Sequence, residues 1–409
     1  MGMRNGWRRL AGQGRSRKTP RLFIDVSVLA RGDAGTGIQR VVRAFWLELI
    51  QIDPRYFEVL PVAGSKRKQY RIIDPHFLEH PLSHLPLGLG RRRIHARAGD
   101  IFLGLDLSAH IVPRHTAQFQ AWRSAGMRSA FLIYDLLPIR HPEWFSDRSA
   151  IFFRQWASTL ATHADVLACI SENVANEVRT WLAETGHENS ELPYPKVSAI
   201  KLGVPMAAMP QAGELSPDEQ SILAWARSGH TIIMVGTIEP RKGHDQVLGA
   251  FEHLWKKYPN DEWNLLIIGR PGWKTEKLQE SISRNPFNGV KLKWISDSDD
   301  NFLNELYKAC SGAVVASRGE GLGLPLLEAA RLGKPVLARD LAVFREIAPD
   351  GVCFFKADTA DGLASALRGW REKGQRTSLA PSLTGWRRGA EQLMQVLTGL
   401  SHEKAKGLW

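Results

Sequence analysis

The stretch Ser317-Arg318-Gly319-Glu320-Gly321-Leu322-Gly323-Leu324-Pro325-Leu326-Leu327-Glu328 decides what this chain can be. Its glycines allow a tight, exposed backbone, and Pro325 stands at the predicted first position of a helix. Free backbone N–H groups at such a helix start can hold a phosphate or a sugar hydroxyl. Glu320 is expected in the loop and Glu328 about one turn into the helix, so that two carboxylates could face one ligand. The alternative is structural: Glu320 caps the helix dipole, and Glu328 pairs with Arg331 on the surface.

A second stretch, Gly236-Thr237-Ile238-Glu239-Pro240-Arg241-Lys242-Gly243, follows the apolar run 231–235. It places two permanent cations, Arg241 and Lys242, where a buried strand ends and a helix begins. Cations held there can neutralise a departing diphosphate, and each such contact is typically worth about 2.7 to 4 kcal/mol. The alternative is a solvated turn. Since neither an Asp-x-Asp pair after a strand nor a cluster of histidines and cysteines is recognised in the sequence, we expect these cations to replace a divalent metal.

Strand-length apolar runs alternate with helical patterns along the whole chain. The runs of the first half are 22–26, 100–105, 129–134 and 166–170, and those of the second half begin at 231–235. Such alternation predicts parallel sheets covered by helices. Residues 185–220 are rich in proline, glutamate and glycine, and are expected to connect the two halves. The sequence therefore predicts an α/β protein of two doubly wound, Rossmann-like domains that face each other across a cleft.

The first half adds two weaker motifs. Gly35 and Gly37 lie in a glycine-rich loop between a predicted strand and a helix, which suits a phosphate. The third glycine of a dinucleotide fingerprint is missing because Arg40 occupies its place, which argues against an oxidoreductase. Asp135 follows the strand 129–134 and could orient an acceptor hydroxyl or only cap a turn.

Composition bounds the remaining possibilities. The 409 residues are 44% hydrophobic and 23% charged, as in ordinary globular proteins. Three cysteines without paired spacing fit a reducing compartment, and no apolar run is long enough for a signal or a membrane span. Much of the net charge of +12 lies in residues 1–20, a basic segment that is expected to be a disordered leader or to bind an anionic membrane. No pattern typical of a nucleic-acid-binding module follows it.

Together the two charged stretches resemble the family 4 glycosyltransferases of the GT-B fold, which carry a Glu-x7-Glu motif and an upstream Glu-Pro-Arg-Lys-Gly. The resemblance is closest over residues 230–350. It implies a retaining, metal-independent enzyme in which Arg241 and Lys242 contact the donor diphosphate, Glu320 lies by the transferred sugar and Glu328 binds the ribose. By the same resemblance Gly35 and Gly37 close on the donor phosphates, and Asp135 matches an acceptor-side element whose histidine is here Tyr134. Donor contacts are also expected from Gly321, Leu322, Gly323 and Leu324.

Charge, the alternation of strands and helices and the apolar spacing near the end set the expected organisation: a basic tail at 1–20, domains at 21–215 and 216–384, and a closing helix at 385–409. The resemblance makes the first domain acceptor-binding and the second donor-binding. The expected reaction moves a hexose from a nucleotide-diphosphate sugar, GDP-mannose or a GDP-deoxyhexose, to a saccharide or lipid-linked saccharide acceptor. No cofactor is expected. The expected setting is bacterial surface polysaccharide synthesis, in the cytoplasm or at the inner membrane. A nucleotide-sugar epimerase or hydrolase, or an inactive nucleotide-sugar-binding protein, would share these motifs.

Overall fold

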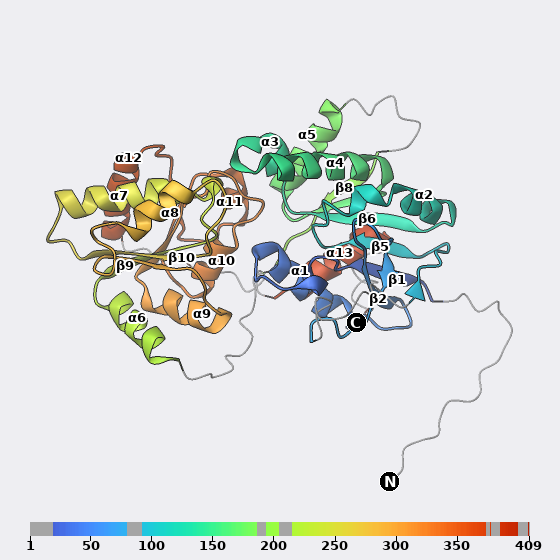
Figure 1. The fold of residues 1–409 in the computed structure, drawn as a ribbon, viewed down its shortest axis with the longest axis horizontal. Coiled ribbons are helices and arrows are strands. Elements are labelled where there is room, and N and C mark those ends of the chain that lie inside the picture. Colours follow the sequence, from blue (N-terminus) through green and yellow to red (C-terminus); the bar gives the residue numbers. More distant parts are fainter. Residues whose placement is uncertain are drawn as a thin grey trace, which may run out of the picture.

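A computed structural model describes residues 19–79, 92–185, 194–203, 215–373, 377, 385–399 and 408 of the chain. The described residues form two β-sheets, each with its own helices, that lie side by side (Figure 1). No helix within these ranges is long and apolar enough to cross a membrane. Residues 1–18 of the basic tail lie outside the described part, so its membrane contact stays a prediction.

The N-terminal sheet has the strand order β4-β3-β2-β1-β5-β6-β7-β8. Its strands are β1 (Arg21–Asp25), β2 (Glu58–Ala63), β3 (Arg71–Ile72), β4 (Arg92–Arg93), β5 (Ile101–Gly104), β6 (Arg128–Ile133), β7 (Val166–Cys169) and β8 (Lys196–Ala199). Strand β3 pairs antiparallel with β2 and with β4, and the other described neighbours in this sheet pair parallel. The carboxyl ends of the parallel strands therefore share one edge of the sheet, where ligands of such folds bind.

Helices of the N-terminal domain follow these strands in turn. They are α1 (Gly37–Leu49), α2 (Thr116–Ser124), α3 (Leu137–Arg140), α4 (Asp147–His163) and α5 (Glu172–Glu184), with short 3-10 helices η1 (Leu29–Arg31), η3 (Val112–Arg114) and η4 (Pro142–Trp144). Helix α1 begins where the Thr36 side chain accepts a hydrogen bond from the Gln39 N–H, which caps the helix. Its apolar stripe, with Val42 and Phe45 fully buried, packs into the core and fixes the glycine-rich loop before it.

The C-terminal sheet is wholly parallel, with the order β11-β10-β9-β12-β13-β14. Its strands are β9 (His230–Val235), β10 (Trp263–Ile268), β11 (Leu292–Ile295), β12 (Gly312–Val315), β13 (Val336–Arg339) and β14 (Cys353–Phe355). Its helices are α6 (Pro217–Arg227), η6 (Pro240–Lys242), α7 (His244–Lys257), α8 (Glu276–Ser283), α9 (Asp300–Ala309), α10 (Leu324–Arg331), α11 (Ala342–Ile347) and α12 (Ala360–Lys373). Helices α7 and α12 cover one face of this sheet, and α6 and α9 the other (Figure 1).

The last described helix, α13 (Arg387–Thr398), returns to the N-terminal domain. Leu393 and Met394 are fully buried in that domain's core, and the rings of Trp386 and Phe45 meet edge to face at 6.0 Å. The Gln392 side chain accepts a hydrogen bond from the Lys201 N–H at 2.7 Å. The chain therefore crosses between the domains twice.

The α/β class and the two doubly wound sheets are confirmed. One expectation from the sequence was wrong: residues 185–220 do more than connect the halves. Strand β8 lies within that segment and pairs parallel with β7, from Val166 opposite Lys196 to Cys169 opposite Ala199. Helix α6 begins there as well, at a capping box in which Ser216 and Glu219 bond to each other's backbone N–H groups. Because the segment is rich in proline, the sequence predicted neither element.

Candidate functional site

Two adjacent strands bring the two charged motifs together. Strands β9 and β12 are neighbours in a parallel sheet, so the loops at their carboxyl ends meet at one edge. The loop after β9 carries Arg241 and Lys242, and the loop after β12 carries Glu320. The sequence predicted that these two loops lie together.

Glu320 is held by both cations. Its Oε2 accepts a hydrogen bond from Arg241 Nη1 at 2.8 Å, while its Oε1 accepts from Lys242 Nζ and, at 2.7 Å, from the Ser317 hydroxyl. Burial alone would raise the pKa of Glu320, but Lys242 and Arg241 outweigh it and lower the pKa to about 2. Glu320 is therefore a carboxylate at neutral pH. Helix α10 has Gly323 at its N-cap and no side-chain capping hydrogen bond, so Glu320 bonds to the two cations rather than to the start of the helix.

Arg241 also bonds to a carboxylate that the motif analysis did not count. Its Nη2 lies 2.7 Å from Oε1 of Glu239, whose side chain is 4% exposed. Burial raises the pKa of Glu239, and the charge of Arg241 opposes that rise. The Nε atom of Arg241 is buried and has no hydrogen-bond partner among the residues described. Glu239 lies in the stretch 236–243, but only the structure shows that its side chain is buried against Arg241.

Glycines let the loop after β12 approach the other domain. A Cβ atom at Gly321 would lie 1.8 Å from the Tyr134 carbonyl oxygen, so no side chain fits there. Gly323 has a φ of 104°, and a Cβ there would lie 2.4 Å from the Phe344 ring. Ser171 adds a hydrogen bond across the same contact: its hydroxyl donates to the Gly321 carbonyl at 3.1 Å. The loop is therefore fixed from both domains.

Asp135 follows strand β6 beside this loop. Its Oδ1 accepts a hydrogen bond from the Leu137 N–H at 3.0 Å, so it does cap the following turn. Burial raises its pKa, and the charge of Arg241 opposes the rise. The neighbouring Tyr134 points away from the site, because its hydroxyl donates to the Leu105 carbonyl at 2.7 Å inside the N-terminal domain. An acceptor-side role for Asp135 stays a prediction.

The glycine-rich loop of the N-terminal domain reaches the start of α10. A Cβ atom at Gly37, the first residue of α1, would lie 3.6 Å from Cδ1 of Leu324. Gly35 has a φ of 66°, and its N–H donates to Asp33 Oδ1 at 2.9 Å. The loop is tied to the C-terminal domain by Arg270, whose Nη1 donates to the Ala34 carbonyl at 3.1 Å. Both glycines therefore lie at the junction of the domains, and their contact with donor phosphates stays a prediction.

Glu328 bonds across the junction rather than along its own helix. Its Oε1 accepts from Arg40 Nη1 at 2.6 Å, and its Oε2 accepts from the Tyr307 hydroxyl at 3.2 Å. The structural alternative, a pairing with Arg331, was wrong, since Arg331 donates to Asn304 instead. In the sequence Arg40 was noted only because it replaces the third glycine of a dinucleotide fingerprint. No sequence pattern indicated that it bonds to Glu328, which lies 288 residues away. Leu322, another expected donor contact, is buried in the same loop.

An Asp-x-Asp pair, Asp297 and Asp299, follows strand β11, contrary to the expectation that the chain has none after a strand. Asp297 pairs with Arg270 at 3.0 Å, and Asp299 accepts from the Phe302 N–H at 2.7 Å and so caps α9. Within the described ranges no three side chains of His, Cys, Asp or Glu gather as they would around a metal ion. Metal independence stays a prediction.

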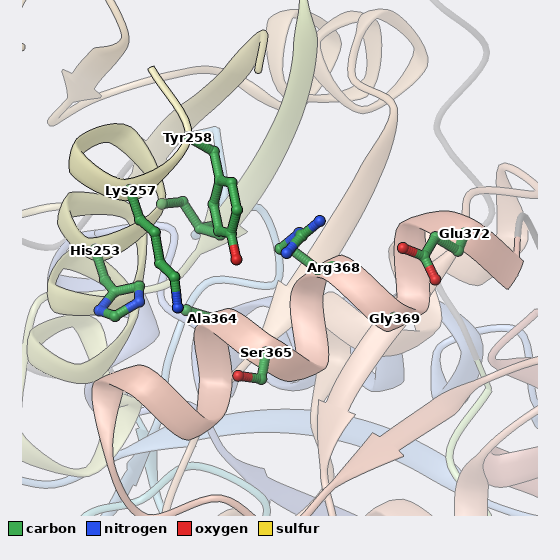
Figure 2. Close-up of a pocket in the computed structure, with 9 residues that line it drawn as sticks. His253, Lys257, Tyr258, Ala364, Ser365, Arg368, Gly369 and Glu372 are labelled. Carbon is green, nitrogen blue, oxygen red and sulfur yellow. The ribbon is translucent and has the colours of Figure 1, made fainter. Parts of the chain in front are cut away.

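A surface pocket of about 260 Å³ lies elsewhere on the C-terminal domain, between α7 and α12 (Figure 2). Arg368 stacks over the Tyr258 ring there, 3.9 Å from its centroid, beside Lys257 and His253. His253, Lys257 and Tyr258 lie at or near the end of α7, and Arg368 lies in α12. Arg241 and Lys242 instead precede the beginning of α7. The pocket is therefore separate from the site that the two motifs build.

Comparison with known proteins gives the class. Residues 217–379 match the family described as "Glycosyl transferases group 1". The Anabaena protein Alr3699/HepE, solved with UDP and glucose, has the same fold, with a TM-score of 0.62 over 93% of this chain and 100% of that one, at 16% identity. The chain therefore contains a group 1 glycosyltransferase domain, and its two parallel sheets have the GT-B-like arrangement.

Its sequence relatives narrow the likeness. The chain is 37% identical over 387 residues to the serotype-specific mannosyltransferase WbdA of Escherichia coli, an alignment that covers 93% of this chain and 47% of that protein. It is 29% identical over 160 residues to the O-antigen chain mannosyltransferase B of Escherichia coli, which covers 37% and 40% of the two. The chain is therefore similar to bacterial polysaccharide mannosyltransferases, and it spans about half the length of the WbdA proteins it matches.

Proposed function

We propose that this chain transfers a hexose, mannose in the first instance, from a nucleotide-diphosphate sugar to a hydroxyl of a saccharide or lipid-linked saccharide acceptor. The observation that carries the proposal is the pair Arg241 and Lys242, held against Glu320 at the carboxyl edge of the C-terminal sheet. The likeness to mannosyltransferases of surface polysaccharide synthesis supports the sugar and the setting.

The cations suit a diphosphate leaving group. When a nucleoside diphosphate departs, negative charge develops on its oxygens, and fixed cations stabilise that charge more than water would. Arg241 and Lys242 are largely buried, so their charge is little screened. The N-terminus of α7, directly after Lys242, adds a favourable dipole.

Glu320 has two tasks in this proposal. Because its pKa of about 2 keeps it ionised, it can accept hydrogen bonds from hydroxyls of the transferred sugar but cannot act as a general acid near neutral pH. Its two oxygens also hold Arg241 and Lys242 in place before the donor arrives. Glu328, fixed by Tyr307 from its own domain, is suited to accept the two hydroxyls of a ribose.

Three finer points belong to the proposal and rest on the resemblance: GDP-mannose as donor, retention of the anomeric configuration, and reaction without a cofactor or metal. A contact between the basic residues 1–20 and an anionic membrane would keep the enzyme near a lipid-linked acceptor, in the cytoplasm at the inner membrane. The charge of that segment is what supports it.

The test measures diphosphate release from GDP-, UDP- and dTDP-sugars, each with and without an α-mannoside acceptor, and each with and without EDTA. We expect release from GDP-mannose that depends on the acceptor and is unchanged by the chelator. Equal release without acceptor would instead indicate a hydrolase or an epimerase. Tight nucleotide binding without turnover on any acceptor would indicate a binding protein, and activity that only magnesium or manganese restores would refute metal independence.

A further inference from the structure

Four aromatic rings gather beside the charged site, two of them stacked on each other. We define the aromatic platform as His141, Trp144, Phe145 and Trp273. The first three follow α3 in the N-terminal domain, and Trp273 follows β10 in the C-terminal domain. The rings of His141 and Trp144 stack at 4.0 Å with an interplanar angle of 13°, and those of Phe145 and Trp273 lie 6.1 Å apart at 30°. The platform is therefore assembled from both domains.

The platform adjoins Glu320. A Cβ atom added at Gly319, the residue before Glu320, would lie 2.7 Å from the Trp144 ring. The backbone carbonyl of Gly319 also accepts a hydrogen bond from Arg241 Nη1 at 3.2 Å. The Trp144 ring thus packs against the same loop that carries the carboxylate between the two cations.

Trp273 is presented on a fixed loop yet remains exposed. Its side chain is 40% exposed, although apolar side chains of this size are usually more buried. The next residue, Lys274, has a φ of 54°, a left-handed conformation that non-glycine residues seldom adopt. The Thr275 hydroxyl and the Gln279 side chain tie the loop down by hydrogen bonds to the Ile238 and Gly272 carbonyls, at 2.8 and 3.1 Å. Backbone strain held in this way is typical of ligand-binding segments.

The two halves of the platform are joined by hydrogen bonds across the domain junction. Trp273 Nε1 donates to the Trp144 carbonyl at 2.8 Å, and Lys274 Nζ donates to the Glu143 carbonyl at 3.1 Å. The polar edge of the indole is therefore satisfied by protein, while part of its surface remains open to solvent. An aromatic surface held this way can bind a ligand whose own faces are apolar.

We propose that the aromatic platform binds sugar rings of the acceptor saccharide. A pyranose has hydroxyls around its edge and C–H groups on its faces, and those slightly positive hydrogens suit the negative face of an aromatic ring. The platform lies next to the site at which the donor sugar is proposed to react, so its occupant is the chain being extended. This inference rests on the proposed function and adds to it the place where the acceptor binds, shared between both domains.

The experiment measures initial rates at saturating donor with methyl α-mannoside and with an α-linked mannotriose as acceptors. Trp273→Ala should raise the KM for the trisaccharide by about fivefold to tenfold, the worth of one ring contact. Trp273→Phe keeps a ring but loses the Nε1 hydrogen bond, and should restore most of the affinity. Tyr56→Ala is the matched control, because Tyr56 is 44% exposed but lies before β2, at the amino ends of the parallel strands and not at their carboxyl ends. This variant should leave the KM for the trisaccharide unchanged.

An unchanged KM in Trp273→Ala would overturn the inference. Equal losses in the Phe and Ala variants would also overturn it, since the indole would then act only through its bond to Trp144. So would loss of binding to phosphatidylglycerol vesicles in Trp273→Ala with an unchanged KM, because the ring would then contact lipid. Wild-type protein that releases no diphosphate in the presence of either acceptor would refute the proposed function itself, which separates the two failures.

Discussion

The two domains contribute to the site in different ways. The C-terminal domain supplies paired charges: Glu320, Arg241 and Lys242 bond to one another within one sheet edge. The N-terminal domain supplies mainly surfaces and backbone, such as the Tyr134 carbonyl against Gly321 and the Trp144 ring against Gly319, with Arg40 as its one ion pair to the Glu-x7-Glu segment among the residues described. In the proposed function, bond breaking therefore depends on the charges of one domain, while substrate placement depends on how the two domains meet.

The largest effect should come from the charged half. Lys242→Ala removes one of the two cations on Glu320 and should lower kcat by about a hundredfold or more. Lys256→Ala, an exposed lysine near the end of α7, is the control and should leave kcat unchanged. Steady-state rates with GDP-mannose check this, with melting temperatures to verify folding. Near-normal turnover of Lys242→Ala would show that Lys242 does not stabilise the departing diphosphate.

A smaller effect should come from the ion pair that joins the halves. Arg40→Gln leaves Glu328 with Tyr307 alone, and should raise the donor KM by about tenfold with little change in kcat, since the lost bond involves a charged group. A cycle with Glu328→Gln isolates the pair: the double variant should resemble Glu328→Gln alone, because Arg40 then has no carboxylate left to hold. A donor KM that falls instead would mean that Arg40 competes with the donor for Glu328.

The smallest effect concerns stability and pH, where the halves also differ. Burial raises the pKa of Asp25 to about 6 and that of Asp106 to about 7, although both accept hydrogen bonds, Asp106 from the Val28 and Leu29 N–H groups. Their folded pKa values lie above the unfolded ones near 4, so the folded chain holds more protons between pH 4 and 7 and loses stability as pH rises through that range. Glu320 is opposite: its stabilisation is lost only as pH falls toward 2.

Asp106→Asn should therefore reduce the fall in melting temperature between pH 5 and pH 8 by about 2 °C. Asparagine can still accept a hydrogen bond from the loop, so the comparison isolates the titration. Melting curves of the two proteins at five pH values check it. A variant whose melting temperature falls as steeply as that of the wild type would contradict the raised pKa.

How far the sequence predicted the site depends on how local each contact is. Glu320, Arg241 and Lys242 were found because each lies in a short motif at the end of an apolar strand, and adjacent parallel strands bring such ends together. Arg40 and Tyr307 were missed as partners of Glu328 because those contacts join distant elements. Glu239 was read as part of a motif and not as a buried acid, because a linear pattern does not show which way a loop residue faces.

The fold follows the same rule. Central strands such as β6 and β9 were expected within one residue of their observed bounds, because buried parallel strands are continuous apolar runs. Strand β8 was missed because only Val197 and Ala199 of its four residues are apolar and it lies at a sheet edge. Strand β14 has only three residues, Cys353–Phe355, and becomes recognisable as a strand only beside β13.

Helix α13 makes the N-terminal domain depend on residues that are synthesised after the C-terminal domain. Leu393, Met394 and Leu397 fill its core, yet they follow the whole C-terminal domain in the chain. During synthesis the second domain can close around its own sheet while the first still has an open apolar groove against α1. The domain that begins to form first is therefore the one completed second, and its nascent form is the one exposed to aggregation and chaperones.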